Sequence, residues 1–297
     1  MRMMRFKSAD GFRLGVVVGD ALADLTAMQP NAPRDIADLL QLGPSILQEI
    51  AAQARIATSA QMIALSDARP ALPIERPGKF ICLGLNYADH VNESAYATQA
   101  YPTLFMRAAT SLIAHEEAMV RPLASVQLDY EAELAVIIGQ TMRHVSADQA
   151  MAGVAGYTCF NDGSVREFQR HTVQWTMGKN FDRTGGFGPL FVTADELPRG
   201  ASGLRISCRV NGEARQSDNT ANMIFKVGET LSYISQGMTL QPGDVVAMGT
   251  PSGVAHAHKP PKWLLPGEVV EVEIEAIGVL RNPVVDEKMQ TSVLAVA

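Results

Sequence analysis

Residues 129–136 read DYEAELAV, and acids occupy three alternate positions of this segment: Asp129, Glu131 and Glu133. Side chains at every second position of a strand point to the same side, so these three acids would share one face. Like charges on one face repel each other, and burial makes the repulsion worse. If this strand is buried, a positive group must therefore compensate for the acids.

A second segment of the same type serves as an internal comparison. In EVVEVEIEA the acids Glu271, Glu273 and Glu275 alternate with apolar residues, as in a half-exposed strand with one solvated face. Alternating acids alone are therefore equally consistent with a solvated strand face in DYEAELAV. Evidence from other segments has to decide between the two interpretations.

A candidate general base occurs in the segment GLNYADHVNES, where His90 and Glu93 are three positions apart. On a helical turn these two side chains lie on one face, where the carboxylate can orient the imidazole for proton transfer. A solvent-exposed polar loop is the alternative interpretation of this pair.

Three further segments carry polar residues next to apolar strands or glycines. Asp162 ends the apolar segment GYTCFND and could supply a third oxygen ligand to a hard cation, although ND-G is also a turn signature. Lys179 lies in a glycine-bounded, aromatic-flanked loop from which it could reach a substrate oxygen; a surface lysine is the alternative. Thr250, in GDVVAMGTPSGV, could bind an anionic oxygen together with backbone N–H groups, or could belong to a tight turn.

The elements that would position these residues form two groups. Residues 1–72 are predicted to be a small N-terminal α/β domain, with a hairpin at Asp10–Gly11 and two helical segments separated at Gly43–Pro44. A proline-rich linker leads into a larger catalytic domain, residues 73–297. Its many short strands and few helices predict a β-dominated α+β fold.

The composition is that of an ordinary globular protein: 297 residues, 47% hydrophobic and 19% charged. A net charge of -6 and the absence of basic clusters argue against nucleic-acid binding. No apolar run is long enough to span a membrane and no signal peptide is recognised, so we expect a cytoplasmic protein without membrane contact. Cys82, Cys159 and Cys208 are widely spaced and are predicted to be buried, reduced thiols.

Seven ordered blocks over roughly residues 75–285 together resemble the fumarylacetoacetate hydrolase family. They are GLNYADH…E, DYEAELAVIIG, GYTCFNDGSVREFQ, GKNFD…GP, RVNGEARQ, SYISQGMTLQPGDVVAMGTPSGV and PGEVVEVEIEAIGVLRNPV. The resemblance is closest to bacterial acylpyruvate or 2,4-diketo-acid hydrolases and to diene-dioate isomerases and decarboxylases. It implies a mixed β-sandwich roll that holds one divalent cation, Mg²⁺ or Mn²⁺, with Ca²⁺ in some members. The implied metal ligands are Glu131, Glu133 and Asp162.

The resemblance also implies roles for the other candidates. His90 and Glu93 match the catalytic dyad, carried on a segment that acts as a lid, and Lys179 matches the lysine that contacts the substrate. Arg166, Gln169 and Thr250 match residues that bind the substrate. Members of the family are usually homodimers, so we expect one here. Asp129 has no matching role and is expected to be structural.

Two departures from the family pattern concern the substrate. Many members read FMK where this chain has Phe105-Met106-Arg107, and the guanidinium of Arg107 adds a bidentate fork that we expect to bind a substrate acid. The loop AHAHKPPKWL replaces a segment that often continues with glycine. Its histidines, His256 and His258, are expected at the surface. Tyr96 and Tyr101 are further candidates for shaping substrate choice.

These assignments predict a metal-dependent hydrolase that cleaves a C–C bond in a 2,4-diketo acid, such as an acylpyruvate, fumarylpyruvate or a 2,4-diketo-3-deoxy sugar acid. The products are a pyruvate-type acid and a carboxylic acid. The same residues are consistent with a decarboxylase or isomerase of the 2-hydroxyhepta-2,4-diene-1,7-dioate or oxaloacetate type. A non-catalytic ligand-binding protein is the remaining alternative, because a fold alone does not fix a function.

Overall fold

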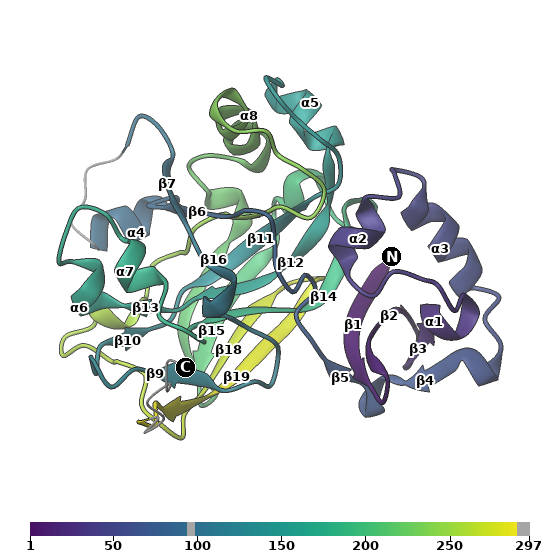
Figure 1. Cartoon of the computed structure of the whole chain (residues 1–297). Helices are drawn as coiled ribbons and strands as arrows, with labels where there is room; N and C mark the ends of the chain where they lie inside the picture. Colours follow the sequence, from purple (N-terminus) through teal and green to yellow (C-terminus); the bar gives the residue numbers. More distant parts are fainter. Residues whose placement is uncertain (94–98, 290–297) are drawn as a thin grey trace, which may run out of the picture.

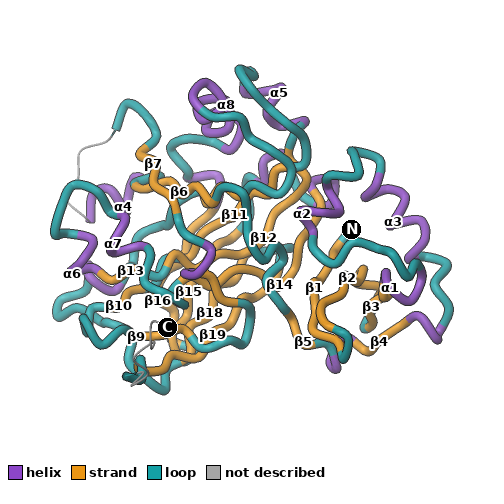
Figure 2. Tube along the Cα trace, in the orientation of Figure 1, coloured by secondary structure: helices purple, strands orange, loops and turns teal. Residues whose placement is uncertain are grey.

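The computed structural model of the chain describes residues 1–93 and 99–289 (Figure 1). Its architecture is α+β and dominated by strands, as expected, with two large sheets, a two-stranded ribbon and short helices around them (Figure 2). The first sheet runs in the order β4 (Met62–Ala64), β3 (Ala21–Asp24), β2 (Gly11–Val18), β1 (Arg2–Ser8), β14 (Gly185–Thr193), β12 (Val154–Asp162), β11 (Ala132–Ile138), β17 (Val245–Ala247), β6 (Phe80–Gly84) and β7 (Thr103–Met106). Two short strands join it at the side: β5 (Arg69–Pro70) pairs with β1, and β8 (Leu112–Ile113) pairs with β14.

The second sheet packs against the central strands of the first. It runs β16 (Glu213–Asn219), β15 (Arg205–Val210), β18 (Val269–Ile274), β19 (Gly278–Asp286) and β9 (Met119–Arg121), and the separate ribbon consists of β10 (Leu128–Asp129) and β13 (Ser164–Val165). One core joins both sheets, with Leu134 and Val136 of β11 packed in the same cluster as Val272 of β18. On the opposite face of β18, Glu271 and Glu273 pair with Arg209. This confirms the half-exposed strand expected for EVVEVEIEA.

The N-terminal segment forms the hairpin β1–β2, with Ser8 opposite Gly11, as predicted from the Asp-Gly turn. Its helices are α1 (Leu25–Met28), α2 (Ile36–Leu40) and α3 (Ile46–Ala54), and the break between α2 and α3 falls where Gly43 adopts a φ of 112°. β1 also pairs antiparallel with β14, so the first sheet runs without interruption into the larger part of the chain. The predicted division into residues 1–72 and 73–297 stays a prediction.

The described residues of the larger part of the chain form the α-helices α4 (Ala88–Glu93), α5 (Ala147–Ala152), α6 (Arg166–Gln169), α7 (Thr176–Lys179) and α8 (Val227–Gly237). α5 begins with a capping box between Ser146 and Gln149. α5 and α8 pack together at one end of the molecule, whereas α4, α6 and α7 gather near the β10–β13 ribbon (Figure 1). The second group carries five of the ten candidate site residues, namely His90, Glu93, Arg166, Gln169 and Lys179.

The strand predicted through DYEAELAV is two strands. β10 ends at Asp129 and pairs with β13, whereas β11 begins at Ala132 and pairs with β12 and β17. The three cysteines are free and buried, as predicted. Among the described residues, no helix has both the length and the apolar character needed to cross a membrane.

Candidate active site

Three carboxylates meet where β11 and β12 lie side by side. The pairing of Ala132 with Asn161 places Glu131 next to Asp162, whose backbone N–H donates to the carbonyl of Glu131 at 2.9 Å. One carboxylate oxygen from each of Glu131, Glu133 and Asp162 lies within 4.8 Å of the others, and all three residues are buried. The structure therefore brings together the three residues that the sequence resemblance implied as metal ligands.

Buried bases compensate two of these acids. Lys179 Nζ donates to Glu131 Oε2 at 2.7 Å and to Asp162 Oδ2 at 2.6 Å. Burial opposes ionisation of Glu131, but the charges of Arg166 and Lys179 outweigh it and hold the pKa of Glu131 well below its ordinary value. Burial alone would lower the pKa of Lys179, but the charges of Asp162 and Glu131 keep it above its ordinary value.

Glu133 differs from its two neighbours. Among the described residues no lysine or arginine forms an ion pair with it, and it accepts a hydrogen bond from the N–H of Gly249 at 3.0 Å. Burial and the charges of Asp162 and Glu131 raise the pKa of Glu133 well above its ordinary value. A divalent cation would neutralise this excess negative charge, and an all-oxygen donor set suits a hard cation such as Mg²⁺, Mn²⁺ or Ca²⁺. The donor set therefore fits the implied metal.

The predicted dyad is formed on α4. His90 Nδ1 lies 2.8 Å from Glu93 Oε1, and the carboxylate of Glu93 accepts the N–H of Gly253 at 3.0 and 3.1 Å from its two oxygens. Asn86, just before the helix, donates to the carbonyl of Met248 at 2.7 Å and so fixes α4 to the loop after β17. The glutamate thus orients the imidazole, and the N–H of Gly253 orients the glutamate.

His90, Glu131 and Glu133 line one cavity of about 70 Å³, whereas Glu93 does not line it and contacts His90. Six predicted residues line it besides Glu131, namely His90, Glu133, Arg166, Gln169, Lys179 and Thr250; the other lining residues are Leu83, Gly84, Leu85, Phe105, Arg170, Trp175 and His256. Asp162 does not line the cavity itself, but its carboxylate accepts a hydrogen bond from Lys179, which does.

Arg107 takes a different position from the other predicted residues. Its guanidinium is fully buried behind Asp162, where it donates to that carboxylate, to the carbonyl of Gly163 and to Thr184 Oγ1. It does not line the cavity. A contact of Arg107 with a substrate acid stays a prediction. In the observed position, the guanidinium of Arg107 binds and orients the carboxylate of Asp162.

The expectation for the loop after Gly253 was wrong for His256. Its side chain is 13% exposed and lines the cavity, with Nδ1 3.3 Å from Asp129 Oδ2. Asp129 is fully buried and also accepts from Arg166 Nε and from the N–H of Ala255, both at 2.7 Å. This carboxylate therefore joins the loop that carries His256 to the arginine beside Glu131. His258 of the same loop is half-buried.

Two residues that position the site, Gln216 and Gly84, lie in the ordered blocks RVNGEARQ and GLNYADH but were not assigned a role from the sequence. Gln216, on β16 of the second sheet, accepts from the N–H of Ala132 and donates to Thr250 Oγ1, both at 2.9 Å. Gly84 admits the indole of Trp175, because a Cβ there would lie 2.2 Å from the ring. Only long-range packing shows these two relationships.

One of the two tyrosine candidates, Tyr101, lies within the described residues. Tyr96 lies outside the described residues. Tyr101 is exposed and stacks on Tyr233, with ring centroids 6.0 Å apart. It does not line the cavity.

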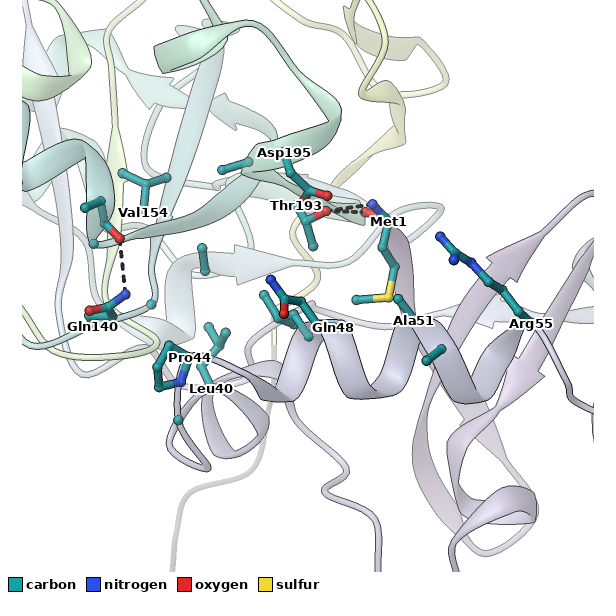
Figure 3. Close-up of a pocket in the computed structure, with 18 residues that line it drawn as sticks. Met1, Leu40, Pro44, Gln48, Ala51, Arg55, Gln140, Val154, Thr193 and Asp195 are labelled. Carbon is teal, nitrogen blue, oxygen red and sulfur yellow. Dashed lines mark hydrogen bonds between the residues drawn. The ribbon is translucent and has the colours of Figure 1, made fainter.

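A larger cavity of about 490 Å³ lies between α3 and the larger part of the chain (Figure 3). Its walls include Leu40 and Ala51 from the N-terminal segment and Val154 at the start of β12. None of the predicted catalytic, substrate-binding or metal-ligating residues lines it. The chemistry is therefore centred on the smaller cavity.

Known proteins similar to this chain come from the same family that the sequence resemblance indicated. Residues 79–285 match the family model described as "Fumarylacetoacetate (FAA) hydrolase C-terminal". The chain is 38% identical over 291 residues to the mitochondrial oxaloacetate tautomerase FAHD2A of Bos taurus, an alignment that covers 96% of this chain and 92% of the other.

Two solved structures share the fold over 97% of this chain and 100% of theirs. The fumarylacetoacetate hydrolase of Exiguobacterium antarcticum has 36% identity and a TM-score of 0.84. The maleylpyruvate hydrolase of Sphingobium sp. SYK-6, in complex with manganese(II) and pyruvate, has 29% identity and a TM-score of 0.80. The chain therefore belongs to the fumarylacetoacetate hydrolase family, whose members include hydrolases and an oxaloacetate tautomerase.

Proposed function

We propose that this chain is a divalent-cation-dependent enzyme that moves a proton at the carbon next to the keto group of a small 2-oxo acid, with oxaloacetate tautomerisation as its main reaction. The observation that carries the proposal is that His90, oriented by Glu93, lines one cavity together with Glu131, Glu133 and Lys179. The third buried carboxylate, Asp162, contacts Lys179. The oxaloacetate tautomerase of Bos taurus, similar over nearly the full length of both chains, supports this choice of substrate.

Glu131, Glu133 and Asp162 would hold the cation, for which we propose Mg²⁺ or Mn²⁺. When bound, the cation supplies a Lewis acid that stabilises an enolate oxygen. The manganese in the maleylpyruvate hydrolase complex supports a transition-metal or magnesium-type ion.

The side chains around the cavity would have separate roles in proton transfer and substrate binding. Glu93 engages Nδ1 of His90, so Nε2 is the nitrogen that accepts the proton from C3 of the 2-oxo acid and returns it to the oxygen. Lys179 and Gln169 donate to the developing negative charge on that oxygen. Thr250, held by Gln216, binds the carboxylate next to the keto group.

Hydrolysis of a 2,4-diketo acid is the second candidate, favoured by the similarity to the maleylpyruvate hydrolase. In that reaction His90 takes a proton from water, which attacks the C4 carbonyl, and the products are a pyruvate-type acid and a carboxylic acid. Decarboxylation and double-bond isomerisation need the same enolate, so the residues of the cavity suit them as well.

The deciding experiment compares two assays on the purified chain with Mg²⁺ and with EDTA. We expect the enol form of oxaloacetate to disappear faster with enzyme and Mg²⁺, as seen in its ultraviolet absorbance, and chelation to abolish this. Release of pyruvate from acetylpyruvate at a higher kcat/KM would instead favour the hydrolase. Activity that is indifferent to EDTA would refute the metal-dependent mechanism.

The dyad is tested by His90→Asn, which we expect to lower kcat by about 10²–10⁴-fold while leaving Mn²⁺ binding unchanged. His144→Asn is the matched control, because His144 is exposed and bonds only weakly to Gln236. Wild-type turnover in His90→Asn would exclude the proposed base. The expected homodimer also stays a prediction, which light scattering on the purified chain checks.

A further inference from the structure

We propose that Arg170 binds the second carboxylate of a 2-oxodicarboxylate and thereby selects dianionic substrates over 2-oxo monocarboxylates. This inference rests on the proposed function, because it concerns the same cavity and names the class of acid that the cavity takes. The basic side chains around the cavity differ in whether they already have acidic partners.

The basic groups deep in the cavity already have partners. Arg166 donates through Nε to Asp129 at 2.7 Å, through Nη1 to Gln169 at 2.8 Å and through Nη2 to Glu131. The ammonium of Lys179 donates hydrogen bonds to both Glu131 and Asp162. If either base turned to a second substrate carboxylate, it would leave a buried acid without its counter-charge, which is costly.

Arg170 differs from both. It follows the last residue of α6, it is exposed, and it lines the cavity. Its side chain makes no hydrogen bond or ion pair with any residue in the described parts of the chain, 1–93 and 99–289, although its backbone N–H bonds to the carbonyls of Arg166 and Glu167, both at 3.2 Å. Hydrogen bonds to the helix therefore fix the backbone of Arg170, whereas its guanidinium remains exposed and can bind a substrate group at the cavity.

The residues that line the cavity are consequently of two kinds. Glu131 and Glu133 are buried acids that offer no positive group to a substrate carboxylate. Arg170 is accessible to solvent, and its planar guanidinium can bind a carboxylate with two parallel hydrogen bonds. A dicarboxylate whose keto-acid end lies near Thr250 and the three carboxylates would therefore extend its other carboxylate toward Arg170.

The test uses two acids with the same four-carbon chain, oxaloacetate and 2-oxobutyrate, which differ by one carboxylate. Dissociation constants are measured with the full chain and Mg²⁺ by calorimetry, together with kcat and KM for oxaloacetate. We expect Arg170→Gln to weaken oxaloacetate binding about tenfold and to raise KM without lowering kcat, because one charge-assisted contact is lost. We expect 2-oxobutyrate binding to stay unchanged.

Two further variants serve as references. Arg170→Lys keeps the charge without the bidentate fork and should recover part of the preference for the dicarboxylate. Arg55→Gln is the matched control, because Arg55 is also an exposed arginine directly after a helix, α3, but lies on the other cavity. It should change neither dissociation constant.

The ratio of the two dissociation constants decides the inference. A ratio that Arg170→Gln leaves at the wild-type value overturns it, whether both acids bind as before or both bind more weakly. A wild type that binds the two acids equally, or binds neither, overturns it too. If the wild type binds oxaloacetate but does not turn it over, the proposed function fails, and the binding ratio still tests Arg170.

Discussion

Lys179 Nζ lies 2.6 Å from Asp162 Oδ2, and both side chains are almost completely removed from solvent. The contact explains how the chain folds with an acid cluster inside it, because the ammonium provides the opposite charge that burial demands. A divalent cation bound by the same acids would draw on the same carboxylate oxygens. Folding stability and cation binding are therefore expected to be linked through Lys179.

The first prediction concerns Lys179→Met. Removing the ammonium leaves Glu131 and Asp162 short of a counter-charge, so the cation-free protein should lose about 3–5 kcal/mol of unfolding free energy. Cation affinity should rise, and Mg²⁺ should restore much of the melting temperature. Thermal unfolding in EDTA and in Mg²⁺, with a Mn²⁺ titration, checks this. Lys262→Met, which breaks an exposed pair with Glu213, is the control. An unchanged melting temperature in EDTA would contradict the prediction.

The second prediction concerns pH and Glu133→Gln. The pKa of Glu133 in the folded protein lies well above its ordinary value of 4.5, so the folded chain retains a proton that the unfolded chain has released. Stability of the cation-free protein is therefore lost as the pH rises above that ordinary value. In EDTA, Glu133→Gln should become more stable relative to wild type as the pH rises, and its Mn²⁺ affinity should be strongly reduced.

Denaturant unfolding between pH 4 and pH 8 measures this difference. Glu273→Gln is the control of opposite sign, because hydrogen bonding to Arg209 lowers the pKa of Glu273 at a half-buried position of the second sheet. It should lose a little stability with or without Mg²⁺. A difference between Glu133→Gln and wild type that does not depend on pH would count against the prediction.

The third prediction concerns the packing of α6 against α7. A Cβ on Gly178 would lie 2.4 Å from backbone atoms of Gln169, so Gly178→Ala must push the two helices apart. We expect a loss of about 1–3 kcal/mol in unfolding free energy from overpacking. We also expect kcat to fall about 10²-fold, because Lys179 moves with α7.

Gly237→Ala is the matched control for Gly178→Ala, since Gly237 also lies in a helix and nothing is within 4 Å of its added Cβ. It should leave stability and kcat nearly unchanged. Denaturant unfolding and steady-state kinetics compare the two variants. Equal effects in both would show that the close approach at Gly178 is unimportant.

The fourth prediction concerns Asp129→Asn. The fully buried carboxylate joins Arg166 to the backbone of Ala255, so its neutralisation should cost about 3–5 kcal/mol of unfolding free energy. Mn²⁺ should still bind, because Glu131, Glu133 and Asp162 remain. Asp148→Asn changes an exposed pair with Arg199 and should have little effect. Loss of Mn²⁺ binding in a folded Asp129→Asn protein would show that Asp129 does more than support its neighbours.

Local patterns in the sequence predicted much of this structure. The Asp10–Gly11 turn and the helix break at Gly43 depend on neighbouring residues, and the structure has both. The acids of the metal site and the dyad were found through ordered blocks along the chain, and they meet in one place. Such features are visible in a sequence because each depends on a short segment or a recognisable motif.

The remaining features depend on contacts between distant segments. Alternation could not show that the chain leaves one strand at Asp129 and enters another at Ala132, so Asp129 was placed on the face of Glu131 and Glu133. Nor could it show that Arg107 packs behind Asp162, 55 positions away in the sequence. His256 was expected at the surface for the same reason, because its partner lies 127 positions earlier.

The pairing of β14 on both sides has a consequence for any shortened form of this protein. Near one end Gly185 lies opposite Asp162, and near the other Leu190 and Val192 pair with β1. Deleting the N-terminal hairpin would therefore turn this part of β14 into an edge strand with unpaired N–H and C=O groups. Such an edge invites pairing with another molecule and aggregation. The hairpin thus protects the sheet that carries Asp162 from unwanted association.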